Sequence, residues 1–150
     1  MRSAARMEWP AIAARLAVER TYWLNTVARD GGPHVSPVWG AVVDDVWFCY
    51  SERHTVKARN IAVDPRVAIH PGGGEDVLIV YGKLIDLGRP QVRPRVVEAF
   101  DRKYASPQDQ PYLPSADPSF DVLYALEPRT AMAWQLSDYD ATQRRWSLQD

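Results

Sequence analysis

One stretch of the chain gathers the residue types that bind a small anion. Ser51 and Thr55 carry hydroxyl groups, and two cationic residues, Lys57 and Arg59, follow them closely. We expect Ser51 to end a strand and Thr55 to begin a helix, where the first backbone N–H groups lack partners. Hydroxyls, free N–H groups and cations together bind phosphate. The segment therefore predicts a phosphate site, although a capped surface helix with solvated basic residues has the same pattern.

The signature motifs of the common nucleotide-binding, metalloprotease and hydrolase sites are missing from the sequence. The run Gly72-Gly73-Gly74 precedes an expected strand and adjoins two acidic residues, so it predicts a hairpin turn rather than a phosphate loop. The 3 histidines do not have metal-ligand spacing. We therefore predict neither a metal site nor a catalytic side chain.

Composition narrows the class of protein. A length of 150 residues with 46% hydrophobic and 25% charged residues predicts one globular domain over residues 1–150. The net charge is −1 and the basic residues are scattered, so we expect neither a nucleic-acid nor a membrane partner. Cys49 is the single cysteine, and no apolar leader opens the chain, which together predict a reduced, cytoplasmic protein.

The apolar pattern divides the chain into short strands with a few inserted helices. The expected helices cover about 8–20, 54–63 and 92–104, and the expected strands cover 21–28, 34–43, 46–51, 66–71, 77–87 and 122–126, which continues after Pro128 as 131–134; 144–148 is a candidate last strand. The stretch 106–119 holds four prolines and is too long for an idle connection, so it predicts a lid or substrate loop. Six or seven antiparallel strands favour a closed or nearly closed barrel over a doubly wound parallel sheet.

Short motifs stand in a fixed order along the chain, at residues 21–24, 29–35, 36–40, 57–61, 64–67 and 80–82. This series resembles the pyridoxamine 5′-phosphate oxidase-like split β-barrel proteins, and most of all their flavin/deazaflavin-dependent oxidoreductases of actinobacteria. The resemblance runs from about residue 8 to 148 and implies an α+β fold, mainly β with helices: a six-stranded antiparallel split β-barrel of the FMN-binding type. It also implies a homodimer with cofactor sites at the subunit interface.

The resemblance assigns cofactor contacts to the phosphate segment. Lys57 matches the phosphate-binding lysine of the family. Ser51 and Thr55 match positions that hydrogen-bond the phosphate or the ribityl chain, while both also suit a helix cap. Arg59 matches a second cation or a plain surface residue, and Asn60 a residue that orients the start of the helix.

A second group of contacts follows from the same resemblance. Pro37, Val38 and Trp39 match the strand beside the isoalloxazine or deazaflavin ring, where backbone groups meet the polar edge of the ring. Trp39 also suits barrel filling, because most of the 6 tryptophans of so small a protein must be core.

The resemblance implies an oxidoreductase that transfers hydride to a small conjugated organic substrate with F420 or FMN as cofactor. The arginine- and alanine-rich composition is typical of actinobacteria and favours F420. The substrate residues of pyridoxamine phosphate oxidase itself have no match, so we do not expect that substrate. The alternative is a non-catalytic protein that binds a flavin, a deazaflavin or a haem-like tetrapyrrole.

Overall fold

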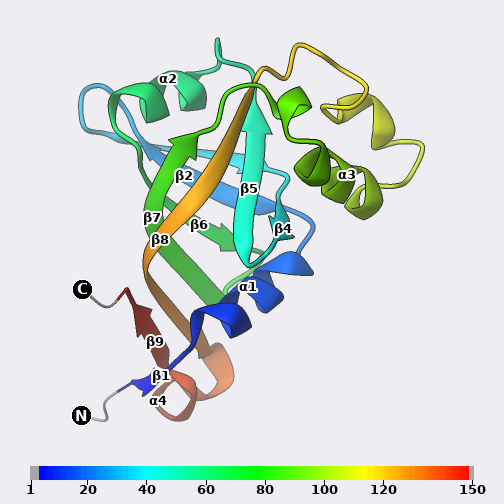
Figure 1. The fold of residues 1–150 in the computed structure, drawn as a ribbon. Helices are drawn as coiled ribbons and strands as arrows, with labels where there is room; N and C mark the ends of the chain where they lie inside the picture. The colour runs from blue at the N-terminus through cyan, green and yellow to red at the C-terminus, as the bar shows by residue number, and fades with distance from the viewer. Residues whose placement is uncertain (1–3, 149–150) are drawn as a thin grey trace.

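Alternating apolar and polar residues form the strands of a nine-stranded sheet in the computed structural model, which describes residues 4–148 (Figure 1). The strands are β1 (Ala5–Arg6), β2 (Tyr22–Val27), β3 (Pro33–Val38), β4 (Ala41–Val43), β5 (Val46–Ser51), β6 (Arg66–Pro71), β7 (Asp76–Asp86), β8 (Val122–Gln135) and β9 (Arg144–Ser147). The helices are α1 (Trp9–Ala17), α2 (Val56–Val63), α3 (Pro94–Lys103) and α4 (Tyr139–Thr142), with 3-10 turns η1 (Pro90–Val92), η2 (Gln110–Tyr112) and η3 (Leu136–Asp138). The three expected helices are confirmed, each shorter than its pattern indicated.

The sheet is mostly antiparallel and does not close. Strands pair in the order β3, β2, β6, β7 and β8, and β8 also pairs with β5, which carries β4 on its other side. At its other end β8 pairs with β9, and β1 lies parallel to β9 (Figure 1). The expectation of a closed or nearly closed six-stranded barrel is therefore wrong in strand number and in closure for residues 4–148: the sheet has 9 strands and remains open between β3 and β5.

The opening follows from the free edge of β3. The Ala28 N–H donates to the Gly32 carbonyl at 2.8 Å, which sets the even-numbered residues of β3 as those that bond to β2. The odd-numbered residues face away from β2, and among them Pro33 and Pro37 have no N–H. A regular ladder cannot form along an edge that lacks these donors.

The predicted strand 34–43 is wrong as one element, because the chain bends at Trp39 and Gly40 and splits it into β3 and β4. A Cβ on Gly40 would overlap the Trp47 ring, so only glycine lets the backbone pass this close. The expected turn at Asp44 and Asp45 is confirmed: both residues have positive φ, 52° and 62°, and join β4 to β5.

The predicted strands 122–126 and 131–134 form one strand, β8, which continues through Pro128. Its pairing with β7 shifts register between Tyr81 and Gly82, and Pro128 lies opposite Gly82. Such a bulge accommodates a residue without an N–H inside a long strand. A Cβ on Gly82 would overlap the Glu127 carbonyl oxygen, so the glycine allows the two backbones to approach.

Two hydrophobic clusters hold the fold together. The larger fills the sheet under α1 and includes Leu16, Tyr22 and Trp47, each 0% exposed. The smaller lies between α3 and the β4–β5 hairpin and contains Phe100 and Leu113. Within residues 4–148 no helix combines the length and the apolar character needed to cross a membrane.

Gly82→Ala should destabilise the protein by about 1–3 kcal/mol, because the added methyl group forces β7 and β8 apart at the bulge. The measurement is the urea midpoint at constant m-value. Gly73→Ala is the matched control, since no atom lies within 4 Å of a Cβ at that position. Equal losses in the two variants would show that the close approach at Gly82 is not a constraint.

Candidate functional site

A cavity of about 410 Å³ lies at the opening of the sheet, between the free edge of β3, the end of β5 and the start of α2. In Figure 1 this is the upper end of β5, where α2 approaches from one side and the segment 106–119 from the other. The lining residues are Thr21, Pro37, Val38, Trp39, Tyr50, Ser51, Glu52, Thr55, Lys57, Tyr112 and Phe120. Residues far apart in the sequence therefore share one site.

The hydroxyl groups at the end of β5 shape the start of α2. Thr55 is the N-cap, and its Oγ1 accepts a hydrogen bond from the Ala58 N–H at 3.3 Å. The Ser51 and Thr55 hydroxyl oxygens lie 3.0 Å apart, and Ser51 is only 4% exposed. The predicted capping role is confirmed for Thr55 but not for Ser51, whose hydroxyl instead bonds to the Thr55 hydroxyl and so lies beside the cap at the cavity.

Several donors at this end of the cavity have no acceptor. Hydrogen bonds account for the N–H groups of Ala58 and Arg59, whereas residues 4–148 offer no acceptor to those of Val56 and Lys57. The Lys57 ammonium likewise has no ion-pair or hydrogen-bond partner in the described part of the chain. Glu52 is the acidic residue of the lining, and its carboxylate lies 3.5 Å from His54 Nδ1. The donors at the start of α2 suit an anion.

The opposite wall of the cavity is aromatic. The Trp39 ring stacks on Tyr104 with centroids 4.3 Å apart and planes at 7°. Tyr50 packs edge-on against Phe120 at 4.9 Å, and its hydroxyl donates to the Tyr112 carbonyl at 2.7 Å. Burial raises the pKa of the Tyr50 hydroxyl, so it remains a protonated donor at neutral pH. This wall suits a planar apolar ring.

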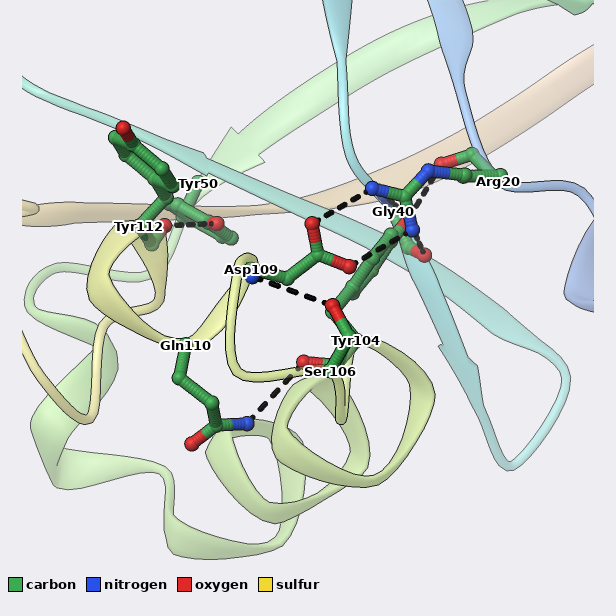
Figure 2. Close-up of polar contacts among 8 residues, drawn as sticks. All are labelled: Arg20, Gly40, Tyr50, Tyr104, Ser106, Asp109, Gln110 and Tyr112. Carbon is green, nitrogen blue, oxygen red and sulfur yellow. Dashed lines mark hydrogen bonds and ion pairs between the residues drawn. The ribbon is translucent and has the colours of Figure 1, made fainter.

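An ion pair outside the cavity supports this wall (Figure 2). The Arg20 guanidinium donates to both Asp109 oxygens, at 2.9 and 2.8 Å, and lies 5.2 Å from the centroid of the Trp39 ring. The Tyr104 hydroxyl donates to the Arg20 carbonyl at 2.7 Å. The hydrogen bonds from Arg20 hold the pKa of Asp109 below its ordinary value.

Lys103 stabilises the bend between β3 and β4. Its ammonium donates to the Gly40 carbonyl at 2.7 Å and to the Tyr22 hydroxyl at 2.8 Å. Burial lowers the pKa of Lys103 to about 8, while the carboxylate of Glu19 acts in the opposite direction. The last residues of α3 thus position the backbone that carries Trp39.

The cavity brings together most of the residues that the sequence singled out: Pro37, Val38, Trp39, Ser51, Thr55 and Lys57. Two others do not line it. Arg59 lies two residues after Lys57 on α2, and its side chain is exposed. Asn60 is 7% exposed and donates to Thr26 Oγ1 at 3.1 Å, so it fastens α2 to β2.

Other lining residues escaped the sequence analysis. Tyr112 belongs to the proline-rich stretch 106–119, whose length indicated a functional loop, and Phe120 follows it directly; the sequence pattern did not show which side chains face the site. Tyr50 and Glu52 flank Ser51, which was predicted to bind phosphate, but nothing in the sequence distinguished these two residues from ordinary strand and turn residues. The Arg20–Asp109 pair spans 89 positions of sequence, so no local signal marks it.

The residues of the cavity fit a ligand with an anionic end and a flat ring. The Lys57 ammonium and backbone N–H line the cavity together with the rings of Trp39 and Tyr50, while Tyr112 and Phe120 line it from the segment 106–120. Phosphate suits the Lys57 donors, and a planar apolar ring suits Trp39.

Comparisons with known proteins give a family and several structural neighbours. The family model described as pyridoxamine 5′-phosphate oxidase matches residues 9–131. A conserved hypothetical protein from Mycobacterium tuberculosis is 22% identical, with a TM-score of 0.70 over 98% of this chain and 89% of that one. An F420 reductase is 25% identical, with a TM-score of 0.61 over 78% of this chain and 94% of that one. A heme binding protein from Mycobacterium smegmatis is 18% identical, with a TM-score of 0.69 over 98% of this chain and 59% of that one. No curated protein matched the chain.

The lowered pKa of Lys103 predicts that stability rises with pH between about 8 and 10 through this group. The folded protein loses the Lys103 proton near pH 8, whereas the unfolded chain keeps it to the ordinary value of 10.5. The unfolded state therefore binds more protons in this window, which makes the free energy of unfolding increase with pH.

Urea unfolding at pH 7.5 and 9.5 checks this prediction. Lys103→Met should reduce the stability gained over that interval, and Lys83→Met on β7 controls for the loss of a lysine. An unchanged gain in Lys103→Met would mean that the lysine titrates alike in the folded and unfolded chains.

Proposed function

This chain belongs to the pyridoxamine 5′-phosphate oxidase family, and we propose that it is an oxidoreductase with a flavin-type cofactor, F420 or FMN, in the cavity between β3, β5 and α2. One observation carries the proposal: unpaired donors at the start of α2 and several aromatic side chains line the same cavity. This arrangement suits the phosphate and the ring system that both cofactors contain.

The polar end of the cavity would hold the cofactor phosphate. Lys57 would supply a charge-assisted contact, and the N–H groups of Val56 and Lys57 would donate to the remaining oxygens. The hydroxyls of Ser51 and Thr55 are already fixed by the cap and can add hydrogen bonds without further ordering. Arg59 and Asn60 would contribute only through the placement of α2.

The β3 side of the cavity would hold the ring system. Pro37, Val38 and Trp39 form the lip of the open sheet, and the carbonyl groups on the free edge of β3 have no strand partner. When bound, a flavin or deazaflavin supplies the hydride-transfer chemistry itself. The protein then has to bind, orient and exclude water, which explains why the site needs no nucleophile or catalytic acid.

Of the two cofactors we propose F420. The arginine-rich composition favours it, and the neighbour described as an F420 reductase is 25% identical to this chain. The substrate would be a small conjugated organic molecule. Fluorescence titration of the cofactor-free protein with F420 and with FMN tests the choice, and binding of neither would remove the oxidoreductase proposal.

The alternative function is binding without turnover, of a flavin, a deazaflavin or a haem-like ligand, as one neighbour is a heme binding protein. The lining residues include no histidine, cysteine or methionine, which are common axial ligands of haem iron. Anaerobic mixing of the reduced, cofactor-loaded protein with enones and quinones separates the two functions. Reoxidation no faster than that of the free cofactor would support the binding role.

Lys57→Ala should weaken cofactor binding by about ten- to a hundredfold, because the variant loses a charge-assisted contact with phosphate. The measurement is the dissociation constant by fluorescence titration. Stability should hardly change, since alanine is a good helix residue. Arg59→Ala on the same helix is the matched control and should bind as the wild type does. Equal dissociation constants for Lys57→Ala and wild type would move the phosphate site elsewhere.

We further propose that the protein works as a homodimer. The sheet face that carries Trp23, Val35 and Tyr81 leaves these side chains 40%, 50% and 40% exposed. The strand register puts them on the same face as Pro37, which lines the cavity. A second copy of the chain would cover these apolar side chains and would then border the cofactor site.

Light scattering at about 10 μM should give twice the chain mass of 17.0 kDa. Trp23→Glu should shift the population to monomers and weaken cofactor binding, because a charge in the covered face would lose its hydration. Val18→Glu, at a position 81% exposed beyond α1, is the control and should remain dimeric. A wild-type monomer would contradict the interface.

A further inference from the structure

We propose that the segment from Ser106 to Phe120, here called the strap, selects the substrate, and that the Arg20–Asp109 ion pair holds it in position. The inference rests on the proposed cofactor site. It assigns specificity to Tyr112 and Phe120, and a positioning role to Arg20 and Asp109.

Hydrogen bonds hold the strap on both sides of Tyr112. On one side Asp109 binds Arg20 (Figure 2), and on the other the Phe120 carbonyl accepts from Gln91 Nε2 of η1 at 3.2 Å. Between them the Tyr112 carbonyl accepts from the Tyr50 hydroxyl at 2.7 Å. These contacts use backbone groups or Asp109, so they leave the Tyr112 and Phe120 side chains free to line the cavity.

Tyr112 is exposed enough for its side chain to contact a ligand. It is 63% exposed, whereas its neighbour Leu113 is 0% exposed and anchors the strap in the smaller hydrophobic cluster. A large aromatic side chain that borders a cavity without packing in the core adds little to folding. Its contact area is available for binding.

The charge distribution of the cavity indicates which kind of substrate would bind beside the strap. Lys57 and Glu52 are the charged lining residues and lie at the start of α2. Tyr112 and Phe120 on the strap are aromatic and uncharged. With the cofactor phosphate at the charged end, the strap side is left for a planar molecule without charge. A charged substrate would lose hydration there without gaining a partner.

The Arg20 side chain couples the strap to Trp39. Its planar guanidinium makes two hydrogen bonds to Asp109 and lies over both Trp39 and Tyr104, 5.2 and 5.5 Å from the ring centroids. The Asp109 side chain is only 13% exposed, so the pair is partly shielded from water. The pair therefore sets the strap relative to the Trp39 wall without lining the cavity.

The test uses the protein loaded with whichever of F420 and FMN it binds, and menadione as a planar, uncharged probe. Quenching of cofactor fluorescence gives the dissociation constant of menadione at equilibrium, and steady-state rates give KM and kcat separately. Tyr112→Ala should weaken menadione binding about three- to tenfold, raise KM and leave the dissociation constant of the cofactor unchanged.

Asp109→Asn tests the positioning role. It should weaken menadione binding about two- to fivefold, with cofactor binding unchanged, because the asparagine cannot keep the charged two-point contact. Arg20→Lys should behave in the same way, since lysine keeps the charge but lacks the planar fork. Asp117→Asn is the matched control: its carboxylate bonds only to Ser119 within the strap, and menadione binding should stay at the wild-type value.

The outcomes separate the two proposals. Wild-type menadione binding in Tyr112→Ala and Asp109→Asn, with the cofactor still bound, would overturn the strap proposal alone. Loss of the cofactor in Asp109→Asn would also overturn it, because the ion pair would then serve the cofactor site. No menadione binding to the loaded wild type would likewise overturn it. If neither F420 nor FMN binds the wild type, the proposed function fails and the strap proposal fails with it.

Discussion

Pro33 and Pro37 remove backbone donors from the outer edge of β3, and much of the structure depends on this local property of the chain. No strand can complete a ladder there, so the sheet stays open between β3 and β5. The end of β5, the start of α2 and the proline-rich segment all meet at the opening. The candidate site thus lies where the free edge of β3 leaves backbone groups without a neighbouring strand.

The smaller hydrophobic cluster fixes the positions of the residues around this opening. Without support, the bend at Trp39 and Gly40 would leave a large ring and a polar backbone turn exposed. Tyr104 stacks on the ring, and Lys103 donates to the Gly40 carbonyl, so α3 fixes the bend from one side. Leu113 in the same cluster fixes the strap. One small core therefore positions both Trp39 and the strap beside the cavity.

Local signals in the sequence predicted much of this arrangement, because helix caps, turns and strand periodicity are set by neighbouring residues. Thr55 at the start of α2 and the Asp44–Asp45 turn belong to this group. The run that was predicted to continue after Pro128 is one strand, β8. The break at Trp39 and Gly40 depends on packing against Trp47, so periodicity alone predicted one strand there. Asn60 was matched to a residue that orients the start of the helix, and its amide donates to Thr26 on β2.

We propose that the donors at the start of α2 bind the phosphate of a flavin-type cofactor. A crystal structure of the protein grown with F420 or FMN would test this. Phosphate density is expected within hydrogen-bond distance of Lys57 Nζ and of the backbone N–H groups of Val56 and Lys57, with the ring against Trp39. Phosphate density elsewhere, or a cavity without cofactor at saturating concentration, would contradict it.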